Sequence, residues 1–346
     1  GIGITNPSVA KVGAGDTQKL AVGIATAHHV FANRYHGDEN HNFFAGPFVG
    51  SSSTESTLNI GIGKSIGFNL TTGNNNVLLG DCVGAGLSAA SHNIFLGAEA
   101  GKSVIDSPNC SILIGRSAGC DMITGSTNIG IGCRVYRGET GGNSNIAIGS
   151  QAGRSFSTAT ATNQYAISIG VFAGRTSVQG SGNISIGCRA GEAQMSCTTG
   201  NNDNIAIGIN AGYQIGGFAY VGCHIHSNII IGCRAGMSAN YGPSNKIDEN
   251  ILIGTCAFTY GRGACNIYIG PYAGCGYHLS QHYGDSNIGI GLSIAMPDAS
   301  GSNQLAIGQT SNYWIVGDSS FNVGIGTTIP TNPVTSGNTQ KLAVGI

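Results

Sequence analysis

His224 and His226 form the most specific pattern for metal chemistry in this sequence. The two histidines are separated by one residue, Ile225, and on a β-strand they would point to the same face. Three such pairs around the axis of a trimer would offer six imidazole nitrogens, a ligand type that suits transition metals. The other interpretation is a polar inserted loop, and both stay open.

Two segments centred on Ser65 and Ser117 have the Gly-x-Ser-x-Gly spacing of a nucleophile elbow. Such an elbow needs a strand-to-helix turn together with histidine and acidic partners. Equivalent segments carry Cys82, Glu99 or Arg134 in place of the serine. The serine therefore occupies a variable surface position, and we expect no catalytic residue and no enzyme activity. A hydrolase using Ser65 or Ser117 is the competing hypothesis.

The eleven cysteines contain no Cys-x-x-Cys pair, so a zinc site is not expected. Cys110 and Cys120 flank one repeat, and Cys265 and Cys275 flank another at the same spacing. Each pair is either a local disulfide or two reduced thiols. With an odd total, at least one thiol is unpaired or bonded to another chain.

These residues sit within a repeat based on Asn-Ile-x-Ile-Gly, of which there are sixteen copies; both isoleucine positions are apolar in every copy, and thirteen copies begin with asparagine. Its base period is 17 residues, with longer steps where residues are inserted. Insertions in a repeat array map to loops. The closing glycines are Gly46, Gly63, Gly80, Gly97, Gly115, Gly132, Gly149, Gly170, Gly187, Gly208, Gly232, Gly254, Gly270, Gly291, Gly308 and Gly326.

The five-residue motif is short, β-branched and alternating, which predicts a strand. In residues 145–149 the two isoleucines point to one face and Ala147 to the other. The middle position is never charged, so we expect both faces to be covered. Three identical chains around an axis would cover the second face, and a dimer would also do so. The predicted structural core comprises Ile60, Ile62, Ile129, Ile131, Ile146, Ile148, Ile184, Ile186, Ile205, Ile207, Ile288 and Ile290.

The repeat predicts an all-β chain, a parallel β-roll or β-solenoid of about sixteen short coils. Seventeen residues accommodate two strand passes with turns, and sixteen coils would span on the order of 75 Å. Many copies continue as Gly-x-x-Ala-Gly, which suits a tight turn. The leading asparagine tolerates a left-handed backbone and is able to bond its stacked counterpart.

The composition excludes several classes of protein. Glycine makes up 58 of 346 residues and charged residues only 9%, too few charges for an ordinary enzyme surface. The scattered basic residues give no footprint for nucleic acid, and no apolar run is long enough for membrane insertion. Aromatic residues in the inserted loops either pack between coils or contact a receptor: Tyr213, Phe218, Tyr220, Tyr241, Tyr260, Tyr277 and Tyr283.

The two ends of the sequence match each other. Residues 17–24 recur verbatim at 339–346, an offset of 322. We therefore expect the chain to be one period of a tandem array, with further copies as partners along a fibre. The expected organisation is a junction segment over 1–30, a β-roll repeat region over 31–326, and the start of the next junction over 327–346.

The coils resemble the head repeats of trimeric autotransporter adhesins, which are left-handed parallel β-rolls that associate as trimers. Residues 312–330 followed by 341–344 resemble a junction in phage tail-fibre proteins, particularly those of marine cyanobacterial phages. The resemblance implies a homotrimeric fibre on a virion or cell surface, with a host glycan or protein as receptor. The resemblance also implies reduced cysteines. Some tail fibres bind iron along their axis through a similar histidine pair, so the resemblance supports an axial metal site at the two histidines. No other cofactor is expected.

We therefore expect a structural protein, a trimeric rod that extends a tail fibre or appendage and presents loops for attachment. The alternative is a bacterial cell-surface adhesin or a self-assembling extracellular fibril.

Overall fold

The computed structural model describes residues 40–104, 108–138, 141–154, 162–175, 180–192, 201–215, 224–239, 246–275, 284–310, 312–326 and 342–344. The chain divides into a unit of residues 1–36 and a unit of residues 37–346. The predicted junction over 1–30 lies outside the described residues, as does most of 327–346.

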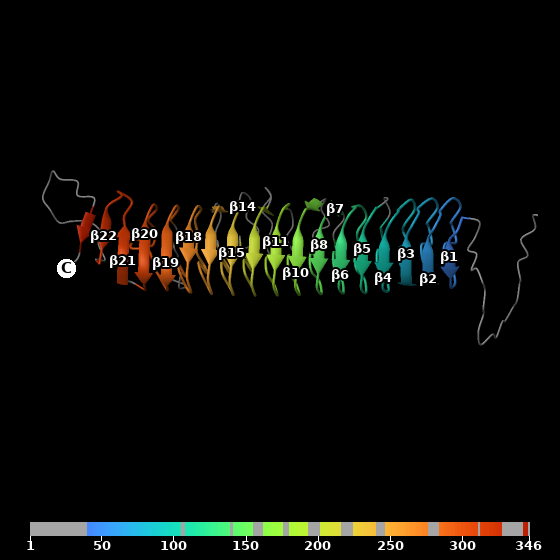
Figure 1. Cartoon of the computed structure of the whole chain (residues 1–346), viewed down its shortest axis with the longest axis horizontal. Coiled ribbons are helices and arrows are strands. Elements are labelled where there is room, and N and C mark those ends of the chain that lie inside the picture. Colours follow the sequence, from blue (N-terminus) through green and yellow to red (C-terminus); the bar gives the residue numbers. More distant parts are fainter. Residues whose placement is uncertain are drawn as a thin grey trace, which may run out of the picture. The chain divides into compact units, whose positions relative to one another are not determined.

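The described part of the second unit is all-β, and its main feature is a stack of parallel strands that confirms the predicted β-solenoid. Figure 1 shows the strands side by side in one row, in chain order. Fifteen strands form this row: β1 (Phe43–Ala45), β2 (Ile60–Lys64), β3 (Val77–Asp81), β4 (Ile94–Leu96), β5 (Ile112–Ile114), β6 (Ile129–Ile131), β8 (Ile146–Ile148), β10 (Ile167–Ile169), β11 (Ile184–Ile186), β13 (Ile205–Ile207), β15 (Ile229–Ile231), β17 (Ile251–Ile253), β18 (Ile267–Ile269), β19 (Ile288–Leu292) and β20 (Leu305–Gln309).

The register of the stack places equivalent residues of the repeat beside each other. Ile167 pairs with Ile184 across a step of 17 residues, and Ile205 pairs with Ile229 across a step of 24. The longer step leaves the register unchanged because the inserted residues lie outside the strand. From β1 to β20 every pairing follows the spacing of the closing glycines, so the predicted repeat boundaries are confirmed there.

The last copy of the motif departs from the prediction. Strand β20 is followed by β21 (Asn312–Gly317), which pairs with β20 in antiparallel orientation. Strand β22 (Val323–Ile325) contains the sixteenth copy and pairs antiparallel with β21 and parallel with β23 (Leu342–Val344). The intervening strand occupies the edge of β20, so fifteen motif copies, not sixteen, form the parallel stack.

The prediction of two strand passes in each coil is also wrong for most coils. After the strand the chain turns, and the return path consists mainly of turns and bends. Among the described residues, short second strands occur in one coil of base length and in four coils with inserted residues: β7 (Gly141–Asn143), β9 (Thr162–Gln164), β12 (Asn201–Asn202), β14 (His224–His226) and β16 (Lys246–Asp248). They pair in parallel as β7 with β9 and as β12, β14 and β16.

The interior of the solenoid holds the middle residue of each motif rather than the two isoleucines. Leu78, Phe95, Leu252 and Tyr268 are fully buried middle residues. The predicted core isoleucines lie on the opposite, outer face of the same strands, where each is half-buried or exposed in the single chain. The middle residue, the residue three after the closing glycine, such as Ala152, and further buried side chains, such as Leu70 and Ile225, fill the interior of the coils.

A large side chain fills the space beside a glycine at the middle position of a neighbouring coil. At Gly61 a Cβ would lie 3.0 Å from the Phe44 ring, which fills the space that Gly61 leaves. Two rings stack at Phe258 and Tyr268, with centroids 5.0 Å apart. The buried apolar residues form two clusters. Between the clusters lies the coil whose middle residue is the buried Ser168.

Candidate functional site

The outer face of the fifteen strands carries two columns of apolar side chains, which we call the isoleucine face. It consists of the two isoleucine positions of each motif. The exposed fractions of Ile60 and Ile62 are 42% and 44%, and Ile131 and Ile148 are each 37% exposed. No charged residue occupies any of these positions. The register aligns them from coil to coil, so the face is continuous from β1 to β20.

The isoleucine face is large for a single chain. Fifteen strands about 4.8 Å apart extend about 67 Å, and residues i and i+2 are about 7 Å apart along a strand. The Cα columns alone therefore enclose roughly 470 Å², before the width of the side chains is added, whereas the largest apolar patch on a typical monomer covers about 300–600 Å². Such a face is suited to binding another apolar surface.

A buried asparagine ladder positions each strand of the isoleucine face. The Oδ1 atom of Asn59 accepts hydrogen bonds from the backbone nitrogen and Nδ2 of Asn76, both at 2.9 Å. Nδ2 of Asn76 also donates to the carbonyl of Ala90 at 2.7 Å. The predicted bond between stacked asparagines is confirmed. The left-handed residue, however, is the one before the asparagine, as at Ser144 (φ 59°), and not the asparagine itself.

The closing glycine forms the corner that ends each strand. Gly149 has φ 128°, and a Cβ there would lie 2.5 Å from the carbonyl oxygen of Gly170 in the next coil. Two residues after the closing glycine the chain adopts a left-handed conformation in each of the fifteen coils, as at Gln151 and Phe172. The left-handed conformation at this second position is therefore a property of the coil backbone, and the position tolerates many side chains.

The two serines of the predicted elbow motif occupy that left-handed position. Ser65 has φ 52° and Ser117 has φ 56°, values that the coils share whatever residue they carry there. The hydroxyl of Ser117 donates to Glu99 Oε2 at 3.1 Å. The geometry of these serines thus follows from the coil, and their contacts give no sign of a histidine base.

His224 and His226 lie on β14, a different wall of the coil from the isoleucine face. Ile225 between them is fully buried, and the His226 side chain is about one-third exposed. Nδ1 of His226 lies 3.7 Å from Asp248 Oδ1, an acidic neighbour that the sequence analysis missed. Among the described residues no group of three or more potential metal ligands is gathered.

The predicted receptor-contacting aromatic residues are mostly outside the described part of the chain: Phe218, Tyr220, Tyr241, Tyr277 and Tyr283. Tyr213 and Tyr260 are described, and both are partly buried. The most exposed aromatic side chains of the described residues lie elsewhere, at Phe321 (73%) and at Tyr165 and Trp314. Tyr165 directly precedes the motif copy that begins at Ala166, and this place directly before the motif is the signal that would have found it.

The four cysteines considered for local disulfides are free thiols in the structure: Cys110, Cys120, Cys265 and Cys275. Burial raises the pKa of Cys120 to about 11, and the neighbouring Asp121 carboxylate adds to the shift. A thiol with a raised pKa is a poor nucleophile at neutral pH.

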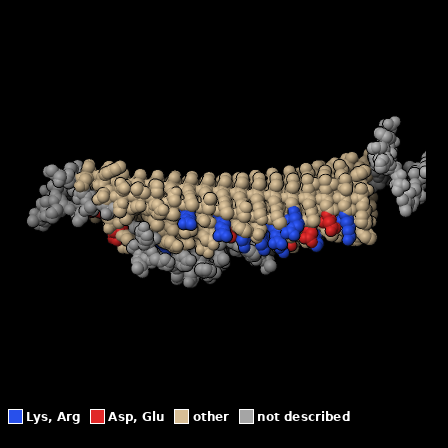
Figure 2. Space-filling model, turned by 90° about the horizontal axis from the view of Figure 1, so that it is seen from below, with Lys and Arg blue, Asp and Glu red and all other residues tan. Residues whose placement is uncertain are grey.

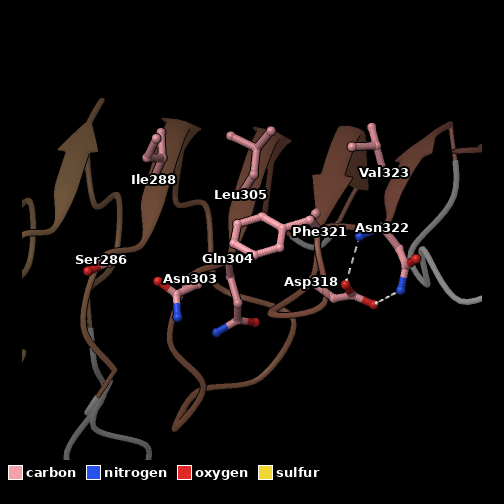
Figure 3. A pocket seen from close by; sticks show the side chains of 10 residues that line it. Ser286, Ile288, Asn303, Gln304, Leu305, Asp318, Phe321, Asn322 and Val323 are labelled. Carbon is pink, nitrogen blue, oxygen red and sulfur yellow. Dashed lines mark hydrogen bonds between the residues drawn. The ribbon is translucent and has the colours of Figure 1, made fainter. Parts of the chain in front are cut away.

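A hollow marks the end of the parallel stack, between β19, β20 and the turn before β22. Figure 3 shows the Phe321 ring reaching from that turn toward Leu305. The turn is held by Asp318, whose carboxylate accepts from the Asn322 backbone at 3.0 Å and from Asn322 Nδ2 at 2.8 Å. Ile288 and Val323 also line the hollow, so it is continuous with the isoleucine face.

Comparison with known proteins adds no family or relative. No family model, no curated protein and no solved structure matches this chain. Across the described part of the chain, nothing forms a helix with the length and hydropathy that membrane crossing requires.

Proposed function

We propose that this protein is a structural fibre component, in which three identical chains associate through their isoleucine faces to form a rod. The isoleucine face is the observation that carries the proposal. The outer surface of the fifteen stacked strands is apolar and uncharged. Removing that surface from water lowers the free energy. An identical chain presents an identical face, which makes self-association the simplest way to cover it.

The stack itself is suited to a mechanical role. Each coil is tied to the next by backbone hydrogen bonds, by the asparagine ladder and by interior side chains. Contacts of this kind repeat between neighbouring coils, as in other quasi-one-dimensional proteins. The proposal therefore assigns the coils to the shaft of a fibre.

In this proposal the fibre is a viral tail fibre or a cell-surface appendage. The motif sequence and the repeated ends support this context, since residues 17–24 recur at 339–346. Further copies of the unit would follow along the same fibre. The inserted loops between Gly187 and Gly291 would then meet a host glycan or protein, because insertions map to loops.

Replacing Ile148 by aspartate tests the association. Ile148 is 37% exposed in the single chain, so the single coil accepts the carboxylate. At an interface between chains the same charge would be buried without a partner and would cost several kcal/mol in each chain. Sedimentation velocity should show wild-type trimers and dissociated Ile148→Asp chains.

Tyr272→Asp is the matched control. Tyr272 is an exposed apolar side chain (46%) at the left-handed turn position, which aspartate tolerates. It lies on the turn side of the coil, so this variant should remain trimeric. Trimers of both variants, or dissociation of both, would contradict an interface at the isoleucine face.

A further inference from the structure

Basic residues that are far apart in the sequence lie in two neighbouring columns on the turns of the solenoid. The columns are the positions two and five residues after the closing glycine. Figure 2 shows the charged side chains gathered on one long side of the molecule, with none on the opposite long side in that view. We call the following set the arginine ladder: Arg134, Arg137, Arg154, Arg175 and Arg189.

Arg137, Arg154 and Arg175 occupy the same column in three successive coils, which follow β6, β8 and β10. Successive coils are about 4.8 Å apart, so three guanidinium side chains leave the backbone at that interval. Burial lowers the pKa of Arg154, and the nearby guanidinium groups of Arg137, Arg175 and Arg134 lower it further. Like charges are thus held close together.

The side chains of the ladder are held in place by their neighbours within the coil. Nη1 of Arg154 donates to Gln151 Oε1 at 2.6 Å. The guanidinium carbons of Arg175 and Arg189 lie 4.7 and 5.8 Å from the centroid of the Phe172 ring. Fixed guanidinium groups lose little conformational entropy when they bind an anion.

Acidic neighbours offset only part of this charge. Arg137 Nε lies 3.4 Å from Asp121 Oδ2, and Glu192 is shared between Arg175 and Arg189 at 3.4 and 3.5 Å. Between residues 99 and 192 the sequence has seven basic and five acidic residues, although the whole chain has a net charge of −1. The ladder is therefore a local excess of positive charge.

A surface hollow continues the ladder toward the preceding coils. Its lining includes four basic side chains, two hydroxyl-bearing residues and two carboxylates: Lys102, Arg116, Arg134, Arg137, Ser103, Ser117, Glu99 and Asp121. Glu99 pairs with Lys102 at 3.1 Å and accepts the Ser117 hydroxyl, so Arg116 and Arg134 supply the charge that these carboxylates leave in excess. Guanidinium and hydroxyl groups in one depression are suited to anionic groups that are interspersed with hydroxyls.

We propose that the arginine ladder and this hollow bind an anionic polysaccharide that lies along the solenoid. A linear polysaccharide carries carboxylate or sulfate groups at regular intervals, and the arginines of the ladder leave the backbone on regularly stacked coils. Arginine recognises such groups through paired hydrogen bonds. This proposal does not depend on the trimer, since the ladder is on the turns and not on the strands.

Nucleic acid fits the same surface less well. Sequence-tolerant binding of a single strand uses exposed aromatic faces on which bases stack. In the ladder the aromatic ring, Phe172, lies against Arg175 and Arg189. Duplex phosphates wind around a helix axis, so a straight row would meet few of them.

The test uses the full chain and fluorescein-labelled heparin dodecasaccharide as the probe, with fluorescence anisotropy at several salt concentrations. The wild type should bind heparin and not a neutral dextran oligosaccharide. The triple variant Arg134→Gln/Arg137→Gln/Arg154→Gln should bind at least tenfold more weakly, and the slope of log K against log salt should become shallower by about 2–3.

Arg234→Gln is the matched control, because Arg234 occupies the same column as Arg134 and lies four coils beyond Arg154, the last arginine of the triple variant. It should bind heparin within twofold of the wild type. Circular dichroism and thermal melting verify that all variants are folded. Absence of heparin binding at low salt, equal binding by the triple variant, or an equal loss in Arg234→Gln would overturn the proposal. Tighter binding of single-stranded or duplex DNA of the same charge would overturn it in favour of nucleic acid.

Discussion

Nδ2 of Asn59 donates a hydrogen bond of 3.0 Å to Oδ1 of Asn42, which lies in the preceding coil. The same bond joins Asn76 to Asn59 and Asn93 to Asn76. All four side chains are buried, so each amide depends on its neighbours in the ladder for its hydrogen bonds. Because unsatisfied buried polar groups are costly, the ladder links the stability of one coil to the next.

Replacing Asn76 by alanine should destabilise the solenoid. The change removes the Oδ1 atom that accepts from the backbone nitrogen and Nδ2 of Asn93, and it removes the Nδ2 that donates to the buried carbonyl of Ala90, a loss of about 2–4 kcal/mol. Chemical denaturation measures it. Asn69→Ala is the control, since Asn69 donates one exposed bond to the carbonyl of Ala85 and should cost less than about 1 kcal/mol. Equal losses in the two variants would show that the ladder does not stabilise the stack.

Gly149→Ala should be more damaging than the same change at a turn glycine. At Gly149 the backbone has φ 128° and the new Cβ would lie 2.5 Å from a carbonyl oxygen, so about 3 kcal/mol or more is expected. At Gly236 the φ is 58° and the nearest atom is 3.2 Å away, so about 1–2 kcal/mol is expected. Thermal melting compares the two variants, and a smaller shift for Gly149→Ala would contradict the corner geometry.

Cys120 should resist alkylation in the folded protein. Burial raises its pKa to about 11, so little thiolate is present at pH 8, whereas Cys110 in the same region is exposed. Iodoacetamide followed by mass spectrometry should label Cys110 first and Cys120 only after unfolding. A disulfide between them would leave both unlabelled until a reductant is added, and that result would contradict the structure.

The raised pKa of Cys120 also predicts a loss of stability at high pH. The folded state holds this proton more tightly than the unfolded state, in which the pKa is near 9. Its contribution is complete below about pH 9 and is lost as the pH rises toward 11. Cys120→Ala should flatten this part of the stability profile, and an unchanged profile would show that other groups cause it.

Strands β10 and β11 should have the least protected amides of the central coils. The interior there contains Ser168 and Ser185 and lies between the two apolar clusters. Local opening exposes little apolar surface at this point and should therefore be easier. Hydrogen exchange should be slower in β4 and β17, whose middle residues are Phe95 and Leu252. Uniform protection along the stack would contradict this expectation.

The sequence was sufficient to predict the strands, their parallel order and their register from β1 to β20. Closing glycines mark a corner that only a residue without a Cβ can occupy, as at Gly149, so their spacing reports the coil length directly. The sequence did not show which face of each strand points into the solenoid. Strand alternation separates Ile148 from Ala147 but does not show which of the two faces the interior, and the interior takes the middle residue whether it is small, as Ala147, or large, as Tyr268.

The arginine ladder and the end of the stack were not predicted, for related reasons. The ladder contains Arg137, Arg154 and Arg175, which are separated by 17 and 21 residues. Because these steps differ, the three arginines fall into one column only when the coils are aligned on their closing glycines. The sixteenth motif copy has a normal sequence. This copy is kept out of the parallel stack by β21, which runs antiparallel to β20 and pairs with its free edge.

The molar mass of the wild-type chain in solution tests the central claim most directly. One chain has a mass of 35.0 kDa, and light scattering coupled to size-exclusion chromatography at several concentrations gives the number of chains in the particle. Association through the isoleucine face predicts a mass of three chains, unchanged on dilution. A mass of one chain at every concentration, with the isoleucine face left in water, would contradict the account.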